Sequence, residues 1–269
     1  MLTIPKIAVV TLLLIGMYLN PAMSQNTDIE MMSLNVYGWK TMPQHSEDYA
    51  KLVVKHNINI LAIQESVEDW QLTTDMPTDY SRAKALLRAL GSCWQRSYQI
   101  YVNHCMGSRF INSGRFDLID GPNATRTGEY ALVEHNTNRF VVINVHFDHE
   151  QQQTRILNMK ETLAQLSSYN SYPQVVLGDF NQRCDAMYSL ITSLMPPLIP
   201  TEIPVSETPT NETTSLEPSL KLVANAGIDC IFINNFSSKL ISKFSSQGKV
   251  VEASPSDHPA AIASLKWIK

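Results

Sequence analysis

Polar side chains that can bind a cation or transfer a proton stand at the ends of apolar runs along this 269-residue chain. Asn35 ends one such run, and Glu65 ends the next. Other amides, carboxylates and imidazoles take similar places further along: Asn144, His146, Asp179, Asn181, Asp229, Asp257 and His258. In open α/β sheets, ligand sites form outside the strand ends, where side chains from several strands converge. The pattern therefore predicts one site built from strand ends.

Each of these residues taken singly has a simpler structural explanation. A strand-ending Asp or Asn is more often a turn residue or a helix cap than a catalytic group. Asp229 fits this explanation poorly, because it lies within the apolar segment Gly227–Ile233. An ionised carboxylate is costly to bury unless something pairs with it. A histidine, an arginine or a metal ion is therefore expected beside Asp229.

As a set, these residue types supply what phosphoester hydrolysis needs. Carboxylate and amide oxygens bind a hard cation such as Mg²⁺ or Mn²⁺, which polarises a phosphoryl oxygen. An Asp can position and deprotonate water, and a His held by an Asp can donate a proton. The sequence carries no nucleophile elbow, P-loop or H-E-x-x-H helix for a rival chemistry. It also lacks the C-x-x-C pair of a zinc site.

Strand-like and helix-like segments alternate along the chain, which indicates an α/β fold. Strands are predicted over Ile29–Asn35, Ile58–Gln64, Tyr98–Asn103, Phe116–Ile119, Tyr130–Glu134, Phe140–Val145, Gln174–Leu177, Ile228–Ile233 and Ala260–Leu265. Helices are predicted over Ser46–His56, Tyr80–Leu90 and Glu150–Ser168, with Gly91 as a C-cap. The last helix would turn Ile156, Leu157, Met159, Leu163 and Leu166 towards the core.

The N-terminal residues 1–24 have the anatomy of a cleaved secretory signal. Lys6 precedes the apolar run Ile7–Leu19, and small residues follow in Pro21–Ser24. An uncleaved anchor is the alternative, although the run is short for a bilayer. Residues 25–269 would then form one domain. Its proline-rich segment Met195–Pro218 is predicted to be a long surface loop rather than a boundary.

Charge and cysteine content fit an exported protein. Removal of Lys6 with the signal leaves 20 basic and 25 acidic residues, a net charge of −5, so no global field draws the chain to nucleic acid. Export permits disulfides, and four cysteines allow three connectivities. The favoured pairing is Cys93–Cys105 with Cys184–Cys230. Glycan acceptor triplets begin at Asn123, Asn211 and Asn235.

Six segments, in order, resemble the endonuclease/exonuclease/phosphatase superfamily, which includes deoxyribonucleases, neutral sphingomyelinases and inositol-polyphosphate phosphatases. They are Ser33–Val36, Ile63–Glu65, Asn144–His149, Gly178–Asn181, Gly227–Phe232 and Ser256–Pro259. The resemblance implies a four-layer α/β sandwich, in which two stacked mixed β-sheets are flanked by helices.

The resemblance also implies a role for each site residue. Glu65 would be the main metal ligand, aided by Asn35 and Asp257, for Mg²⁺ or Mn²⁺. Asp179 would activate water, and Asn181 would touch the phosphate. His258, held by Asp229, and His146 would face the scissile phosphate. Asn35 and Asn144 are expected substrate contacts. The segment Cys93–Glu129 matches no branch of the family, and within it Arg126, just before the strand Tyr130–Glu134, is chosen as a phosphate contact.

Departures from the family pattern leave the substrate open. Cys230 replaces the usual aromatic residue after the motif aspartate, which points to its use in a disulfide. Three functions remain: a secreted nuclease, which is favoured; a phospholipid or phosphoinositide hydrolase; and a catalytically silent binding protein. A monomer with no membrane span after signal cleavage is expected.

Overall fold

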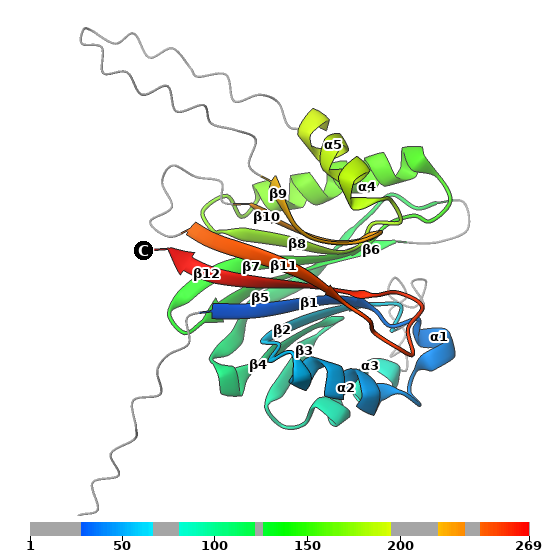
Figure 1. Ribbon diagram of the computed structural model, residues 1–269. Helices are drawn as coiled ribbons and strands as arrows, with labels where there is room; N and C mark the ends of the chain where they lie inside the picture. Colours follow the sequence, from blue (N-terminus) through cyan, green and yellow to red (C-terminus); the bar gives the residue numbers. More distant parts are fainter. Residues whose placement is uncertain (1–27, 67–80, 122–125, 195–219, 235–242, 269) are drawn as a thin grey trace, which may run out of the picture.

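The computed structural model describes residues 28–66, 81–121, 126–194, 220–234 and 243–268. The predicted signal, the proline-rich segment and the three glycan acceptor asparagines lie outside these residues. Within them, two six-stranded β-sheets stack face to face, with helices on both outer faces (Figure 1). The predicted four-layer α/β sandwich is confirmed.

The first sheet has the strand order β11-β12-β1-β2-β4-β3. Its strands are β1 (Asp28–Asn35), β2 (Ile60–Gln64), β3 (Trp94–Ser97), β4 (Ile100–Asn103), β11 (Lys243–Val251) and β12 (Ala260–Ile268). Strands β1 and β2 run parallel, whereas β12 is antiparallel to β1. The C-terminal ends of β1 and β2 and the start of β12 therefore meet at one edge.

The second sheet has the order β5-β6-β7-β8-β10-β9. Its strands are β5 (Ser108–Asp117), β6 (Thr127–His135), β7 (Asn138–His146), β8 (Gln174–Asp179), β9 (Leu220–Ala226) and β10 (Asp229–Asn234). Strands β7 and β8 are parallel, and β10 is antiparallel to β8. The ends of β7 and β8 and the start of β10 thus share an edge, as the register pair Asp179 and Asp229 shows.

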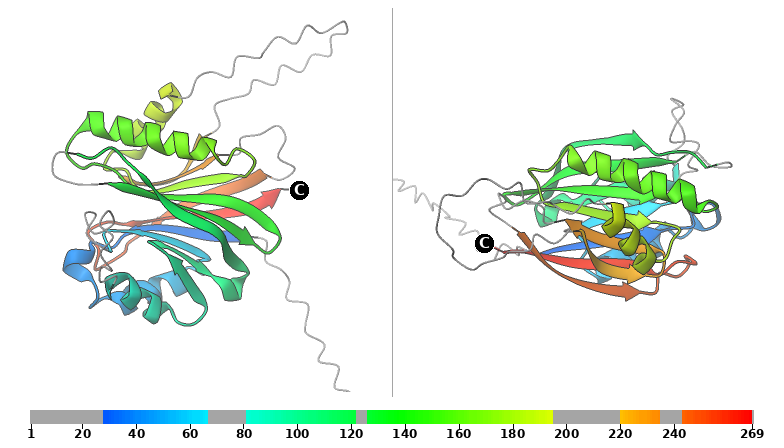
Figure 2. Two further views of the ribbon diagram at one scale, coloured as in Figure 1. Left: turned by 180° about the vertical axis from the view of Figure 1, so that it is seen from behind. Right: turned by 90° about the horizontal axis from the view of Figure 1, so that it is seen from above.

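Helices cover the outer faces of both sheets (Figures 1 and 2). The helices are α1 (Gly38–Thr41), α2 (Ser46–Lys55) and α3 (Ser81–Leu90) on the first sheet, and α4 (Gln152–Ser167) and α5 (Cys184–Leu194) on the second. A 3₁₀ turn spans His104–Met106. Three apolar clusters fill the spaces between the four layers: one between the sheets and one under each set of helices. Removal of these apolar faces from water is the main contribution to the stability of the fold.

Two predicted elements differ in detail from the structure. Strand β5 ends at Asp117, so Leu118 and Ile119 lie beyond it, because pairing with β6 starts at Ser108 and ends where β6 begins. Helix α4 buries Met159 and Leu166 as predicted, but Ile156 and Leu157 are only half-buried. Its buried face instead includes three polar residues: Thr154, Asn158 and Thr162.

The buried polar face of α4 is stable because its groups find partners. The amide of Asn158 donates to the Ile119 carbonyl at 2.7 Å, and its oxygen accepts from the Asp148 N–H at 3.2 Å. Thr162 Oγ1 donates to the Asn158 carbonyl at 2.8 Å. Buried polar groups carry little cost when they are hydrogen-bonded. The helix therefore packs on a face that hydrophobicity alone does not reveal.

Two disulfides join Cys93 to Cys105 and Cys184 to Cys230, so the favoured pairing is confirmed. The first closes the segment between α3 and the 3₁₀ turn. The second ties the start of α5 to β10, one residue after Asp229. None of the helices in the described part of the chain has the length and apolar content that crossing a bilayer requires.

Candidate active site

Five of the predicted site residues converge where the two sheets meet at their shared end. Glu65 follows β2 in the first sheet, and His258 precedes β12. His146 ends β7, Asp179 ends β8 and Asp229 begins β10 in the second sheet. Two groups of acidic and imidazole side chains, Glu65–His146–Asp179 and Asp179–Asp229–His258, have donor atoms within 4.8 Å of one another. Asp179 belongs to both groups and therefore lies at the centre of the site.

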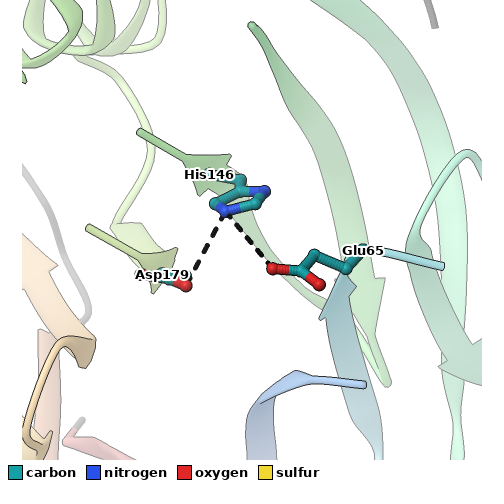
Figure 3. Close-up of side chains that lie close together, drawn as sticks. All are labelled: Glu65, His146 and Asp179. Atoms are coloured by element: carbon teal, nitrogen blue, oxygen red, sulfur yellow. Dashed lines mark ion pairs between the residues drawn. The ribbon is translucent and has the colours of Figure 1, made fainter. Parts of the chain in front are cut away.

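His146 faces two carboxylates from different strands (Figure 3). Its Nε2 lies 3.9 Å from Glu65 Oε1 and 3.7 Å from Asp179 Oδ2. On the other side of the ring, Arg126 Nη1 lies 3.2 Å from Nδ1. Since a guanidinium can only donate, Nδ1 must accept, and the proton of the neutral ring is on Nε2. Burial and the nearby Arg126 charge lower the pKa of His146.

His258 is held by Asp229 through a hydrogen bond of 2.7 Å between Nδ1 and Oδ2. This bond raises the pKa of the His258 imidazole to about 9. Asp229 is fully buried, which raises the pKa of its carboxyl, while the His258 bond opposes the rise. The imidazole is thus protonated at neutral pH, and its Nε2 is the ring atom not used by Asp229. The histidine expected beside Asp229 is present.

Asn35 joins the two sheets at the site. Its Nδ2 donates to Glu65 Oε1 at 2.9 Å and to Asp179 Oδ2 at 3.0 Å, while its Oδ1 accepts from the Tyr37 N–H at 2.9 Å. The side chain is fully buried. Asn35 therefore fixes the separation of two carboxylates that come from different sheets. Ser256 Oγ also donates to the Asn35 carbonyl at 2.6 Å, which ties the loop before His258 to β1.

Asn181 lies beside Asp179 and orients it. The Asn181 N–H donates to Asp179 Oδ1 at 2.8 Å, and its side-chain amide donates to the Phe147 carbonyl at 2.9 Å. Asn181 and Glu65 both have left-handed backbones, with φ of 48° and 59°. Such conformations cost free energy in non-glycine residues and cluster at functional sites. Gly178 allows β8 to approach β7, because a Cβ there would lie 2.0 Å from the Val145 carbonyl oxygen.

Three predicted site residues lie elsewhere than at the centre. Asp257 is half-exposed at the rim, with Oδ1 4.0 Å from His258 Nε2. Arg126 is 4% exposed and contacts the imidazoles of His146 and His149. Asn144 is buried between the sheets, where Gln64, Glu129 and the Ile63 carbonyl use its amide. In the described structure, both its amide nitrogen and its amide oxygen are used by these protein partners.

Sequence reasoning did not single out His149 or Glu129. His149 Nδ1 accepts from Arg126 Nη2 at 3.1 Å, so a second imidazole contacts the guanidinium that also contacts His146. The sequence could have identified His149, since this residue lies within the family-like segment Asn144–His149. It could also have identified Glu129, because this residue is an acid beside the apolar run Tyr130–Val133, as Asp229 is beside Cys230–Ile233.

The oxygen-rich donor set fits a hard divalent cation. Among buried side-chain atoms of the described residues, Glu65 Oε2 and Asp229 Oδ1 lack a hydrogen-bond partner. A buried carboxylate oxygen without a partner is costly, and a bound cation or a donor from a substrate removes that cost. Glu65, with Asn35 beside it and Asp257 at the rim, offers the oxygens that Mg²⁺ and Mn²⁺ prefer.

No family model matches this sequence, and no curated protein matches it. Solved structures do match over most of the chain. An endonuclease/exonuclease/phosphatase from Bacteroides vulgatus is 15% identical, with a TM-score of 0.61, over 90% of this chain and 100% of that one. The mannosyl-6-phosphatase Bt3783 of Bacteroides thetaiotaomicron is 15% identical, with a TM-score of 0.56, over 90% and 100% of the two chains.

TDP2 from Caenorhabditis elegans is also 15% identical, with a TM-score of 0.58, over 89% of this chain and 75% of that one. These likenesses establish the fold and bear out the resemblance that the six sequence segments predicted. The chain has the endonuclease/exonuclease/phosphatase fold.

Proposed function

We propose that this protein is a divalent-metal-dependent phosphoester hydrolase. One observation carries the proposal: Glu65, Asp179 and Asp229 converge with two imidazoles in different protonation states, across the junction of two sheets. Turn or cap chemistry accounts for none of these contacts. The arrangement combines cation ligands, a base and two proton donors, which are the parts that water attack on a phosphoester requires.

In this proposal Glu65 would hold the cation and Asp257 would contribute a further oxygen. Asn35, whose Nδ2 donates to Glu65 Oε1 in the described structure, would have to turn its amide to offer its oxygen. When bound, Mg²⁺ or Mn²⁺ supplies charge that polarises a phosphoryl oxygen and offsets the negative charge of the transition state. Glu65 Oε2, a buried atom without a hydrogen-bond partner, supports this assignment. The exposed Asp257 is the ligand that completes the set from the solvent side.

The protein side chains carry out the proton transfers. Asp179, fixed by Asn35 and Asn181, is the group that orients water and accepts its proton. Asn181 lies beside it for contact with the phosphate. The Nε2–H of His146 and the charged imidazole of His258 donate to phosphoryl oxygens, where negative charge grows. The buried Arg126 acts through His146 and His149 in this scheme, by holding their Nδ1 atoms as acceptors.

A nucleic-acid phosphodiester is the proposed substrate. Basic side chains border the Glu65 end of the first sheet: Arg96 donates to the Tyr98 carbonyl at 2.6 Å, and the Arg115 guanidinium lies 5.0 Å from the centre of the Tyr98 ring. Local positive charge with an aromatic ring suits a polyanionic chain, despite the negative total charge. Phosphomonoester hydrolysis is the second candidate, supported by the likeness to a protein named mannosyl-6-phosphatase.

One activity panel tests the function. Plasmid DNA, RNA, sphingomyelin, a phosphoinositide and mannose 6-phosphate are incubated with the protein, with and without EDTA. We expect hydrolysis of nucleic acid that needs Mg²⁺ or Mn²⁺ and stops with EDTA. Glu65→Gln should lose at least ~10²-fold, since it removes the central anionic ligand, whereas Glu47→Gln on the exposed face of α2 should not change the rate. Hydrolysis of any of these esters at full rate in metal-free buffer rejects the mechanism.

Export is also part of the proposal. Both disulfides support an oxidising destination, where such bonds persist. The mature chain is expected to begin near Gln25 and to be a monomer. Intact mass spectrometry of protein collected outside the cell measures the first point, and a retained Met1–Ser24 segment would contradict it.

A further inference from the structure

A buried polar network lies between the two sheets, next to Glu65 but outside the site. Its members are Gln64, Ser66, Gln99, Glu129 and Asn144, and none is more than 3% exposed. They come from β2 and the residues just after it, from the turn before β4, and from β6 and β7. The mechanism proposed above uses none of them directly. A buried network of hydrogen-bonded polar groups makes the segments that it joins more rigid.

The carboxylate of Glu129 is where the branches of the network meet. Its Oε2 accepts from the Gln99 backbone N–H at 3.0 Å and from Asn144 Nδ2 at 3.1 Å. The Asn144 branch continues to Gln64, whose Nε2 donates to Asn144 Oδ1 at 2.7 Å. The Gln99 branch continues to Ser66, since Gln99 Oε1 accepts from the Ser66 N–H at 3.1 Å and from its Oγ at 2.7 Å.

Both branches therefore end on the residues that flank Glu65 in the chain. Glu65 itself has a φ of 59°, a conformation that a non-glycine residue keeps only where its surroundings fix it. The close approach of Gly38, where a Cβ would lie 2.0 Å from the Glu65 carbonyl oxygen, fixes the same peptide from the other side. The direction of the Glu65 carboxylate consequently depends on how firmly Gln64 and Ser66 are held.

We propose that Glu129 is a positioning residue for Glu65: it anchors, through Asn144–Gln64 and Gln99–Ser66, the left-handed turn that aims the Glu65 carboxylate at the cation. The proposal rests on the proposed function, in which Glu65 binds that cation. Supporting partners of metal ligands commonly change metal affinity by ~10- to 100-fold when they are removed. If Glu129 had only a structural role, its replacement would lower the free energy of unfolding and leave the metal affinity unchanged.

Mn²⁺ binding to the full chain, measured by isothermal titration calorimetry, separates these two roles. Glu129→Leu removes the shared acceptor and should weaken Mn²⁺ binding ~10-fold or more. Glu129→Gln keeps an oxygen at that place and should bind within ~3-fold of the parent. Gln99→Leu cuts only the Ser66 branch and should also weaken binding, which provides a second variant if Glu129→Leu does not fold.

The matched control is Val133→Ala. Val133 lies on the same strand and the same face as Glu129, is fully buried in the apolar core, and takes no part in the network. The Val133→Ala protein should be less stable than the parent, yet bind Mn²⁺ within ~2-fold of it. The substitution removes packing but no hydrogen bond of the network. If Glu65→Gln weakens Mn²⁺ binding but folded Glu129→Leu and Gln99→Leu proteins bind Mn²⁺ like Val133→Ala, the proposal is overturned.

Hydrogen–deuterium exchange of residues 60–66 without metal provides a readout that does not depend on the proposed function. Exchange there should rise ~10-fold in Glu129→Leu and Gln99→Leu, and far less in Val133→Ala and Glu65→Gln. Unchanged exchange in the network variants overturns the positioning role. If exchange rises but Glu65→Gln binds Mn²⁺ as well as the parent, the positioning role stands and the metal assignment of the proposed function fails.

Discussion

The contact between His258 and Asp229 joins a half-buried imidazole to a carboxylate that solvent does not reach. Removing the negative charge with Asp229→Asn should keep the side-chain shape but lower the pKa of His258 from about 9 towards its ordinary value near ~6.5. If the charged imidazole is the active form, the alkaline fall in rate moves towards acid. NMR titration of His258 and the pH dependence of kcat/KM measure the two effects.

Removal of the imidazole itself should have the larger effect. His258→Ala is expected to lower turnover by ~10²-fold or more, as for loss of a general acid or charged stabiliser. His45→Ala is a suitable control, because His45 is an exposed histidine beside Asp48, on the loop before α2. Circular dichroism should show the same fold for both variants. Near-normal turnover of His258→Ala on the true substrate would refute its catalytic role.

Strand β6 carries a carboxylate into the space between the sheets, and this has a consequence for stability. Burial raises the pKa of Glu129 to about 7, above its ordinary value of 4.5. A folded pKa above the unfolded one means that the stabilisation is present below pH ~4.5 and is lost as pH rises through ~7. The contribution of Glu129 to the free energy of unfolding should therefore fall by an amount on the order of 2 kcal/mol between pH 5 and pH 8.

Glu129→Gln should remove most of that fall, because an amide does not titrate. Glu134→Gln, on the same strand, is the control: hydrogen bonds from Arg139 and Arg109 lower the pKa of Glu134, so its carboxyl is already ionised throughout this range. Urea unfolding at pH 5, 6, 7 and 8 measures the slope for each variant. An equal slope in the parent and in Glu129→Gln would contradict the pH dependence assigned to Glu129.

Apolar runs made the central strands predictable from the sequence. The edge strands and the polar buried face of α4 could not be predicted in this way. Strands such as β8 and β10 are buried on both faces, so each contains a nearly continuous run of apolar residues. Strand β11 is exposed along most of the residues whose side chains are described, and β9 alternates irregularly, so neither has a clear period. Helix α4 packs through Asn158, whose amide donates to the Ile119 carbonyl, 39 residues away in the chain. Such tertiary hydrogen bonds leave no local signature.

For the site, the order of the residues in the sequence predicted which of them converge. It did not predict which partner each side chain contacts. The convergence of Glu65, Asp179 and Asp229 followed from their places at strand ends. The internal use of Asn144 did not, because the same residue type at the same spacing serves a substrate or a neighbouring strand equally well. Only the register of β6, β7 and β2 decides between them.

On the scale of the molecule, the disulfides differ in the length of chain that they close. Cys184–Cys230 spans 46 residues and Cys93–Cys105 spans 12. In the chain-entropy model, opening the longer loop costs about 4 kcal/mol and the shorter about 3 kcal/mol. Paired Cys→Ser variants unfolded in urea measure both costs. Only the Cys184–Cys230 variant should also lower activity, since Cys230 follows Asp229.

Four cysteines that react with iodoacetamide in the native, unreduced protein would contradict this assignment. A larger loss of stability from opening Cys93–Cys105 would instead show that native-state strain, rather than loop entropy, decides the order.

The position of β12 has a consequence for the biosynthesis of the protein. This last strand lies between β11 and β1, and Lys266 pairs with Asp28 at the opposite end of the chain. His258 lies two residues before the start of β12. While a chain is still being synthesised from its N-terminus, the first sheet has a gap where β12 belongs and the site lacks an imidazole. A site built in this way is complete only after β12 has been synthesised and has paired with β11 and β1.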